Sequence, residues 1–321
     1  MNRHPESRPI IGPLGKGEVS NVLRREKKAS ISRTSLDVIE DRCIGCKRCV
    51  VVCPSFVLEM VGGKSRVIRG EWCIGCGHCG GVCPTAAILQ NGIAFERHPK
   101  GGEETAISPE ALDLLIRERR SIRVYTPDPL PRPLLERILD AGRYGPTGSN
   151  SQNVHYVVLT SPDQIKALRE MTLRFYEKVF SRVKHWPGRF FLSLLGGKKT
   201  VEYLQESLPK VEYVRDQIQQ GKDRLFYHAP VVIVTHAESW DSSSSFNCSV
   251  ALYHCSLKAH TLGLGCCFNG FLVNAVNHDR NIKTWLGIPQ THRCYAAMAL
   301  GYPAMKYPNL VHRHPPRVVW R

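Results

Sequence analysis

The sequence lacks any apolar run of the roughly 18 residues that a membrane-spanning helix requires. Its N-terminal residues also lack the apolar core of a secretory signal peptide. We therefore expect a soluble protein of the cytoplasm with no membrane association. A hydrophobic fraction of 42% across 321 residues predicts a substantial core and about two domains.

Common nucleotide-binding motifs are also absent. The segment "GLGCC" (263–267) lacks the G-x-G-x-x-G order of a dinucleotide-binding turn, and it follows a predicted helix rather than a strand. The segment "GPLGKG" (12–17) lacks the spacing of a phosphate-binding loop. Neither segment therefore predicts nucleotide binding.

Acidic residues are few: 28 Asp and Glu stand against 44 Lys and Arg, which gives a formal net charge of +16. The positive charge is spread along the chain, which favours an acidic protein partner or a bound phosphate over nucleic acid. Residues 1–35 carry eight Lys or Arg and three Glu. We interpret them as a solvated basic arm, with an organellar transit peptide as the alternative.

Cysteine is abundant, with 13 residues. In a chain without a secretory signal, this number indicates metal binding rather than disulfides. The motif C-x2-C-x2-C-x3-C-P occurs twice, at 43–54 and 73–84. The five cysteines outside these motifs are interpreted as small buried side chains without chemistry. They are Cys248, Cys255, Cys266, Cys267 and Cys294.

The spacing within each motif favours an iron–sulfur cluster over structural zinc, because zinc sites usually place a longer loop between two cysteine pairs. Between the motifs, "FVLEMVGGKSRVI" (56–68) predicts a hairpin that turns at Gly62-Gly63. This stretch resembles the bacterial two-[4Fe-4S] ferredoxins. The resemblance implies a ferredoxin-like domain over 36–98 with two crossed ligand sets. One set is Cys43, Cys46, Cys49 and Cys83, and the other is Cys53, Cys73, Cys76 and Cys79.

The remainder of the chain, from about residue 108, alternates predicted helices with a few strands. Ser108 and Pro109 are typical of a helix start, and the apolar residues that follow recur at helical spacing. Further helices are predicted at 133–145 and 245–263, and strands at 154–160, 229–237 and 294–303. This pattern indicates an α+β or three-layer domain.

Five pieces of this region occur in the order found in the nitroreductase family of FMN enzymes, which the region resembles. They are "RRSIRVY" (119–125), "GPTGSNSQN" (145–153), "HAPVVIV" (228–234), "GLGCCFNGF" (263–271) and "ALGYP" (299–303). The resemblance covers 108–321, except for an unmatched segment at 161–225. It implies a three-layer α/β/α FMN domain and a homodimer whose interface contains the flavin sites.

The resemblance also implies which residues bind FMN, while the flavin itself carries the chemistry and no side chain is predicted to be catalytic. Arg119, Arg120, Ser121 and Arg123 would hold the phosphate and ribityl chain, with Arg313 or Arg317 completing the phosphate site. Asn150 and Gln152 would contact the flavin edge from the partner subunit. Asn269 and Gly270 would lie along the ring near N5, with Gly265 shaping the approach to it. The segment 161–225 is interpreted either as a lid or as a helical hairpin that covers core.

Together the parts predict an iron–sulfur flavoenzyme. A low-potential donor, either ferredoxin or flavodoxin or else NAD(P)H, would reduce two [4Fe-4S] clusters and then FMN. The final acceptor would be a small electron-poor molecule such as a nitroaromatic, a quinone or an activated alkene. Alternatives are an electron-relay or redox-sensing protein, and a specialised reductive dehalogenase or flavin-modifying enzyme.

Overall fold

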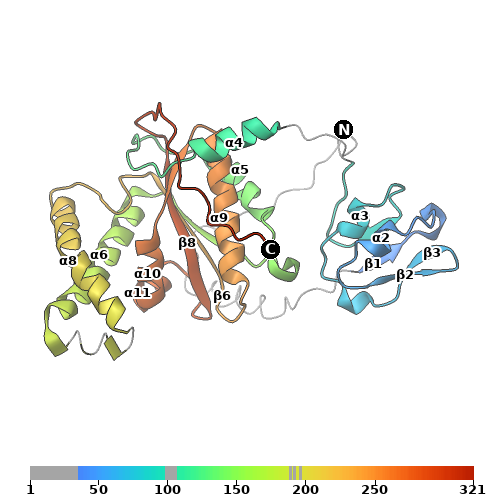
Figure 1. Cartoon of the computed structure of the whole chain (residues 1–321), viewed down its shortest axis with the longest axis horizontal. Helices are drawn as coiled ribbons and strands as arrows, with labels where there is room; N and C mark the ends of the chain where they lie inside the picture. Colours follow the sequence, from blue (N-terminus) through green and yellow to red (C-terminus); the bar gives the residue numbers. More distant parts are fainter. Residues whose placement is uncertain (1–34, 98–106, 188–189, 191–192, 195–196) are drawn as a thin grey trace. The chain divides into compact units, whose positions relative to one another are not determined.

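The computed structural model describes residues 35–97, 107–187, 190, 193–194 and 197–321 (Figure 1). The chain divides into two compact units, 1–102 and 103–321, which are treated separately below. The predicted basic arm lies outside the described residues, apart from Ser35.

The N-terminal unit contains two antiparallel strand pairs and two short helices. Strand β1 pairs with β4, and β2 pairs with β3 in the predicted hairpin. Gly62 and Gly63 form its turn with φ of 59° and 80°, values that favour glycine. The hairpin prediction is confirmed. The elements are β1 (Leu36–Val38), α2 (Arg48–Val51), β2 (Leu58–Val61), β3 (Lys64–Val67), α3 (His78–Gly81) and β4 (Ile88–Gln90).

The core of this unit is small and contains cysteine thiols as well as aliphatic side chains. Val57 and Leu58 are almost completely buried, and they pack with Ile88 and with Cys49 and Cys79. A core of this size buries little apolar surface, so small domains of this kind usually depend on bound metal for stability. Folding of this unit is therefore expected to depend on its metal groups.

The C-terminal unit is built around a four-stranded sheet in the order β5-β6-β8-β7, with every neighbouring pair antiparallel. Strand β6 is buried along most of its length, as its unbroken apolar run predicts. The strands are β5 (His155–Leu159), β6 (Val231–Glu238), β7 (Gly265–Phe268) and β8 (His292–Gly301).

Helices cover both faces of this sheet (Figure 1). Val231 and Ile233 of β6 pack with residues of α5 and α9, whereas Val232 and Val234 pack with residues of α6, α10 and α11. This alternation follows from the two-residue period of a strand. The helices are α4 (Pro109–Glu118), α5 (Arg132–Arg143), α6 (Pro162–Lys184), α8 (Lys198–Gln219), α9 (Ser244–Thr261), α10 (Gly270–His278) and α11 (Arg280–Trp285). The prediction of an α+β fold with a three-layer domain is confirmed.

The predicted start of the first helix in this unit is also confirmed. The Ser108 hydroxyl accepts a hydrogen bond from the Ala111 amide at 3.2 Å, and Pro109 occupies the first helical position. The helix ends at Glu118, directly before the arginine-rich segment.

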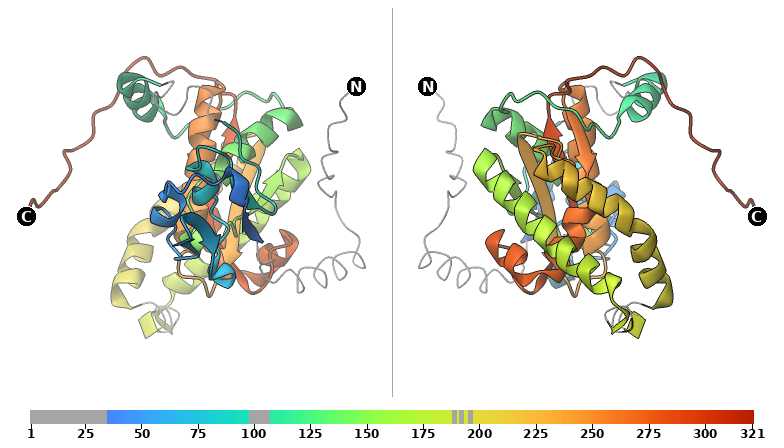
Figure 2. Two further views of the ribbon diagram at one scale, coloured as in Figure 1. Left: turned by 90° about the vertical axis from the view of Figure 1, so that its right-hand side faces the viewer. Right: turned by 90° about the vertical axis from the view of Figure 1, so that its left-hand side faces the viewer.

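The unmatched segment 161–225 contains α6 and α8, two long helices that contact each other (Figure 2). Ile165 and Leu168 of α6 are buried in the core beside α10. The Tyr176 hydroxyl donates to the carbonyl of Phe271 at 2.9 Å. Helix α6 therefore contributes to the core, while the two interpretations of the segment, as a hairpin that covers core and as a lid, stay predictions.

No helix in the described part of the chain is long and apolar enough to cross a bilayer.

Candidate functional site

The first cysteine-lined pocket lies in the N-terminal unit and brings together the first set that the resemblance implies. Its wall includes Cys43, Cys46, Cys49 and Cys83, so three residues come from one motif and one from the other. The pocket encloses about 300 Å³ of empty space.

The second pocket gathers the complementary set, with Cys53 joining the cysteines of the second motif. The set is Cys53, Cys73, Cys76 and Cys79. Each set contains three cysteines of one motif and one of the other, so the two sites suit the same kind of group. Four thiols around each space are the donor set of a [4Fe-4S] cluster. His78 lines this pocket as a neighbour of the sulfurs.

Backbone and side-chain donors surround the sulfurs. The amides of Val57 and Ala87 donate to Cys53 and Cys83 at 3.4 and 3.2 Å, at matching places after each motif. Gln90 donates from Nε2 to the Cys73 sulfur at 3.5 Å. Hydrogen bonds to cluster sulfurs tune the reduction potential. Sequence reasoning missed Gln90, because nothing in its local pattern indicates that β4 turns its side chain toward the second motif.

The two pockets differ in exposure and charge. Cys46 is the exposed cysteine among the eight, whereas Cys76, its counterpart in the second motif, is partly buried. Lys47 and Arg48 follow Cys46 and are exposed, but Gly77 and His78 follow Cys76. The first pocket therefore opens on a basic surface.

In the C-terminal unit, the arginine-rich segment runs extended beside β7. The amide of Ile122 donates to the carbonyl of Cys266 at 3.0 Å. The Arg119 side chain lies near the thiol of Cys266 and lowers its pKa, whereas Ser121 and Arg123 lie near the thiol of Cys267 and lower its pKa. Cys266 and Cys267 are successive residues of β7 and point to opposite faces, so this row of three donors places Arg119 on one side of the strand and Ser121 and Arg123 on the other.

This row has unused donor capacity. Within the described residues, Arg119 Nε is buried without a hydrogen-bond partner. Burial raises the pKa of the Cys266 thiol to about 11, and Arg119 opposes that shift. Arg119 as a whole is partly buried and Arg123 is exposed, so both guanidinium groups are accessible to a ligand. Their donors suit the oxygens of a phosphate group.

Gly265 allows the segment to lie this close. A Cβ atom at this position would lie 2.4 Å from Cγ1 of Ile122, which is buried. Gly265 was predicted to shape the approach to the flavin ring; the structure shows that it makes room for the arginine-rich segment.

The turn with Asn150 and Gln152 has an unusual backbone. Ser149, Asn150 and Gln152 have φ of 50°, 54° and 47°, in the left-handed region that non-glycine residues rarely adopt. The side chain of Asn247 in α9 stabilises the turn, because its Oδ1 accepts a hydrogen bond from the Gly148 amide at 3.0 Å. Backbone strain of this kind is concentrated at functional sites in proteins, so this turn is a candidate binding segment.

The side chain of Asn269 is engaged within the protein, and its predicted contact with the flavin ring stays a prediction. Its Oδ1 accepts from the Leu272 amide at 2.9 Å, and its Nδ2 donates to the carbonyl of Leu225 at 2.7 Å. The buried amide thus caps α10 and anchors the preceding loop. The space around Gly270 is open, because a Cβ there meets nothing within 4 Å.

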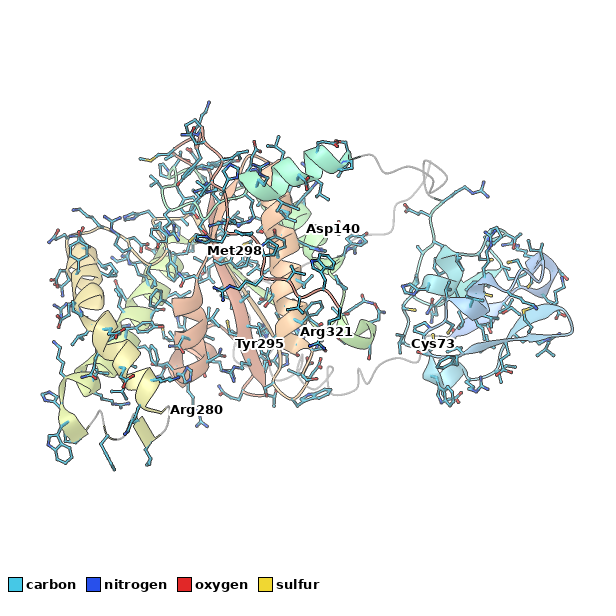
Figure 3. All side chains as sticks on the ribbon, in the orientation of Figure 1. Cys73, Asp140, Arg280, Tyr295, Met298 and Arg321 are labelled. Carbon is cyan, nitrogen blue, oxygen red and sulfur yellow. The ribbon has the colours of Figure 1, made fainter. Side chains whose placement is uncertain are left out.

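The remaining predicted arginines have different surroundings. Arg120 stacks over the ring of Tyr307, with its Cζ 5.4 Å from the ring centroid. Arg313 and Arg317 lie in an exposed irregular segment that continues to Arg321, labelled in Figure 3. Their participation in a phosphate site stays a prediction.

All five cysteines outside the two motifs are buried, as expected. Burial raises the pKa of Cys248, Cys255 and Cys294 to about 12, which keeps these thiols protonated and unreactive.

Family models match both units. The model of the nitroreductase family matches residues 116–302, more than half of the chain. The chain belongs to the nitroreductase family. A 4Fe-4S dicluster domain matches residues 42–106, which confirms the predicted two-cluster domain. Membership of the nitroreductase family also confirms the predicted oxidoreductase class of this protein.

Two relatives align with this chain over most of their own length. The 4-nitrobenzoate reductase of Nocardioides sp. (strain LMS-CY) is 27% identical over 214 residues, which is 62% of this chain and 83% of the relative. The NADH dehydrogenase of Thermus thermophilus is 30% identical over 211 residues, which is 64% of this chain and 93% of the relative. The FMN-bound nitroreductase structure from Bacteroides fragilis NCTC 9343 is 22% identical, with a TM-score of 0.47, and covers 66% of this chain and 100% of that chain.

Proposed function

We propose that this protein transfers electrons from an external low-potential donor, through two [4Fe-4S] clusters and FMN, to a small electron-poor acceptor. The observation that carries the proposal is the presence, in one chain, of two four-cysteine pockets and a nitroreductase-family domain. When bound, the clusters supply one-electron carriers, and FMN exchanges one or two electrons.

The side chains of the two cysteine pockets and of the arginine-rich segment are suitable for binding the clusters and FMN. Each pocket offers four thiols, and the amides of Val57 and Ala87 stabilise charge on the sulfurs. Arg119, Ser121 and Arg123 would hold the FMN phosphate. Their donors, together with the unpartnered Nε of Arg119, support this assignment.

Electrons are proposed to enter at the cluster of Cys46, because its surroundings are exposed and basic. Changing Lys47→Glu and Arg48→Glu together should slow reduction by an acidic ferredoxin about tenfold or more at low ionic strength, since complementary charges steer association. Stopped-flow absorbance measures the rate. The matched control is Lys198→Glu with Lys199→Glu, an equal charge change at exposed positions of α8. Equal slowing in both variants would reject entry at this surface.

A homodimer is also proposed. The segment 304–321 is irregular and exposes apolar side chains, including Trp320 at 90% and Val319 at 81%. Figure 2 shows this C-terminal segment extending from the last strand. Exposed apolar surface of this extent is typical of an interface. Light scattering should give about twice the chain mass of 36.1 kDa, and a mass near 36.1 kDa would contradict the dimer.

Anaerobic turnover tests the proposed function. Reduced ferredoxin or NAD(P)H is supplied separately as donor, with 4-nitrobenzoate and a quinone as acceptors. The proposal predicts continuous acceptor reduction with one of the donors. If the protein becomes reduced but no small acceptor is consumed, an electron-relay or sensor function replaces the enzyme proposal.

A further inference from the structure

Three histidines from different strands meet at one end of the sheet. His155 begins β5 and lies opposite His236 of β6, and His292 begins β8. Their ring centroids are 5.0 to 5.2 Å apart. Strand β8 runs from this end toward Gly301, which pairs with Gly265 beside the arginine-rich segment. The histidine cluster is thus separated from the proposed flavin phosphate site by the length of β8.

A carboxylate completes the cluster. Glu238 lies opposite His292 in the ladder, and its Oε1 is 4.0 Å from His292 Nε2. One potential ligand atom from each of His155, Glu238 and His292 lies within 4.8 Å of the others. Ligands of a tetrahedral zinc ion lie roughly 3.4 Å apart, given bonds of about 2.0–2.1 Å. Closing the site therefore requires small side-chain rotations, for which the exposed His155 has room.

Neighbouring residues orient two of these ligands. His236 is buried, and its Nδ1 lies 3.0 Å from Nδ1 of His292. This hydrogen bond leaves His292 Nε2 directed toward Glu238. Asn153 donates from Nδ2 to Glu238 Oε2 at 3.0 Å, so the other carboxylate oxygen faces the histidine. Hydrogen bonds from outside that fix ligand orientation are typical of metal sites in proteins.

The strand geometry at this point is irregular. The register of β6 with β8 shifts between Thr235 and His236, so that Tyr295 is the extra residue on β8. Figure 3 labels Tyr295 near this end of β8 and Met298 further along. The Tyr295 hydroxyl donates to the backbone carbonyl of Glu238 at 3.3 Å. A bulge redirects side chains and is common beside binding sites.

We propose that His155, His292 and Glu238 bind one divalent transition-metal ion of the zinc type, with His236 acting as a positioning residue for His292. Two imidazole nitrogens and one carboxylate oxygen suit zinc-like ions better than magnesium or calcium, which prefer oxygen ligands. Three protein ligands leave a coordination position for water. The bound ion would join the ends of β5, β6 and β8, and it would stabilise the folded sheet by mass action.

The test is a calorimetric titration of zinc chloride into anaerobically purified full-length protein with its clusters in place. Cluster absorbance is followed in parallel to verify that zinc does not displace iron from the cysteines. We expect one zinc ion per chain. The variants His155→Ala and Glu238→Gln should each weaken binding about tenfold or more. His312→Ala, at an exposed histidine of the C-terminal segment, is the control and should bind as the unaltered protein does.

Two substitutions distinguish positioning by His236 from a purely structural role. His236→Asn retains a polar group near the His292 Nδ1 and should keep zinc affinity within about threefold, whereas His236→Val should weaken it about tenfold. Absence of zinc binding to the unaltered protein, or equal affinity in all five variants, would overturn the proposal. Because His155 is exposed, its variant should fold even if substitutions at buried His236 do not.

Discussion

Replacing Cys83 by alanine is expected to remove the cluster bound by the first cysteine motif, and not the cluster of the motif in which Cys83 stands. Iron should fall from about eight atoms per chain toward four, because a [4Fe-4S] cluster needs four ligands. Cys83 lines the pocket of Cys43 and Cys46, whereas Cys53 lines the pocket of Cys76. The crossed arrangement therefore predicts which cysteine variants lose the same cluster.

Anaerobic electron paramagnetic resonance of the reduced variants shows which cluster each variant retains. Cys83→Ala and Cys46→Ala should retain the same cluster and give the same spectrum, and Cys53→Ala and Cys76→Ala should share the other. Cys248→Ala is the matched control, since Cys248 is buried in the other unit and its pKa is raised to about 12. Iron content should not change in this control. A Cys83→Ala spectrum that matches Cys76→Ala would contradict the crossed arrangement.

The double substitution Arg119→Gln with Arg123→Gln should cause the second large effect, a loss of FMN. Each guanidinium is expected to form a charge-assisted hydrogen bond to the phosphate, so removing both should weaken FMN binding by at least about 100-fold. Released flavin per chain and a fluorescence titration of FMN with the apoprotein measure the effect. Arg119 is only partly buried and Arg123 is exposed, so the fold should persist.

Arg117→Gln is the control for this prediction. Arg117 is exposed in the last turn of α4, immediately before the row, and contributes the same charge to the domain. Its variant should retain FMN. Retention of FMN by the double variant at the level of the Arg117→Gln protein would show that the phosphate is held elsewhere. Arg120 beside Tyr307 would then be the first residue to examine.

The cysteine motifs show how much the sequence can predict when chemistry fixes the spacing. Thiols three and four residues apart are held close by the chain itself, so the ferredoxin-like unit and its two-residue glycine turn follow from local patterns. The strong helix start at Ser108 and the apolar run of β6 were predictable for the same reason. Local signals were sufficient in these elements.

Other features depend on contacts between distant residues. Strand β7 has only four residues and no alternating pattern, and its pairing with β8 comes from packing in the completed sheet. The Asn269 side chain caps α10 and binds the carbonyl of Leu225, 44 positions away along the chain. Likewise, His155, His236 and His292 have no shared motif, because strand register alone brings them together. Sequence spacing contains no signal for such groupings.

The most direct test of the proposed electron path is an anaerobic spectral titration of the purified protein, after iron, sulfide and released FMN have been quantified. Reduced ferredoxin and NAD(P)H are added separately while flavin absorbance is followed. The account predicts two clusters and one FMN per chain, with the flavin bleached after the clusters are reduced and its absorbance restored by 4-nitrobenzoate or a quinone. Clusters that become reduced while bound flavin stays oxidised, or protein that binds no flavin, would contradict it.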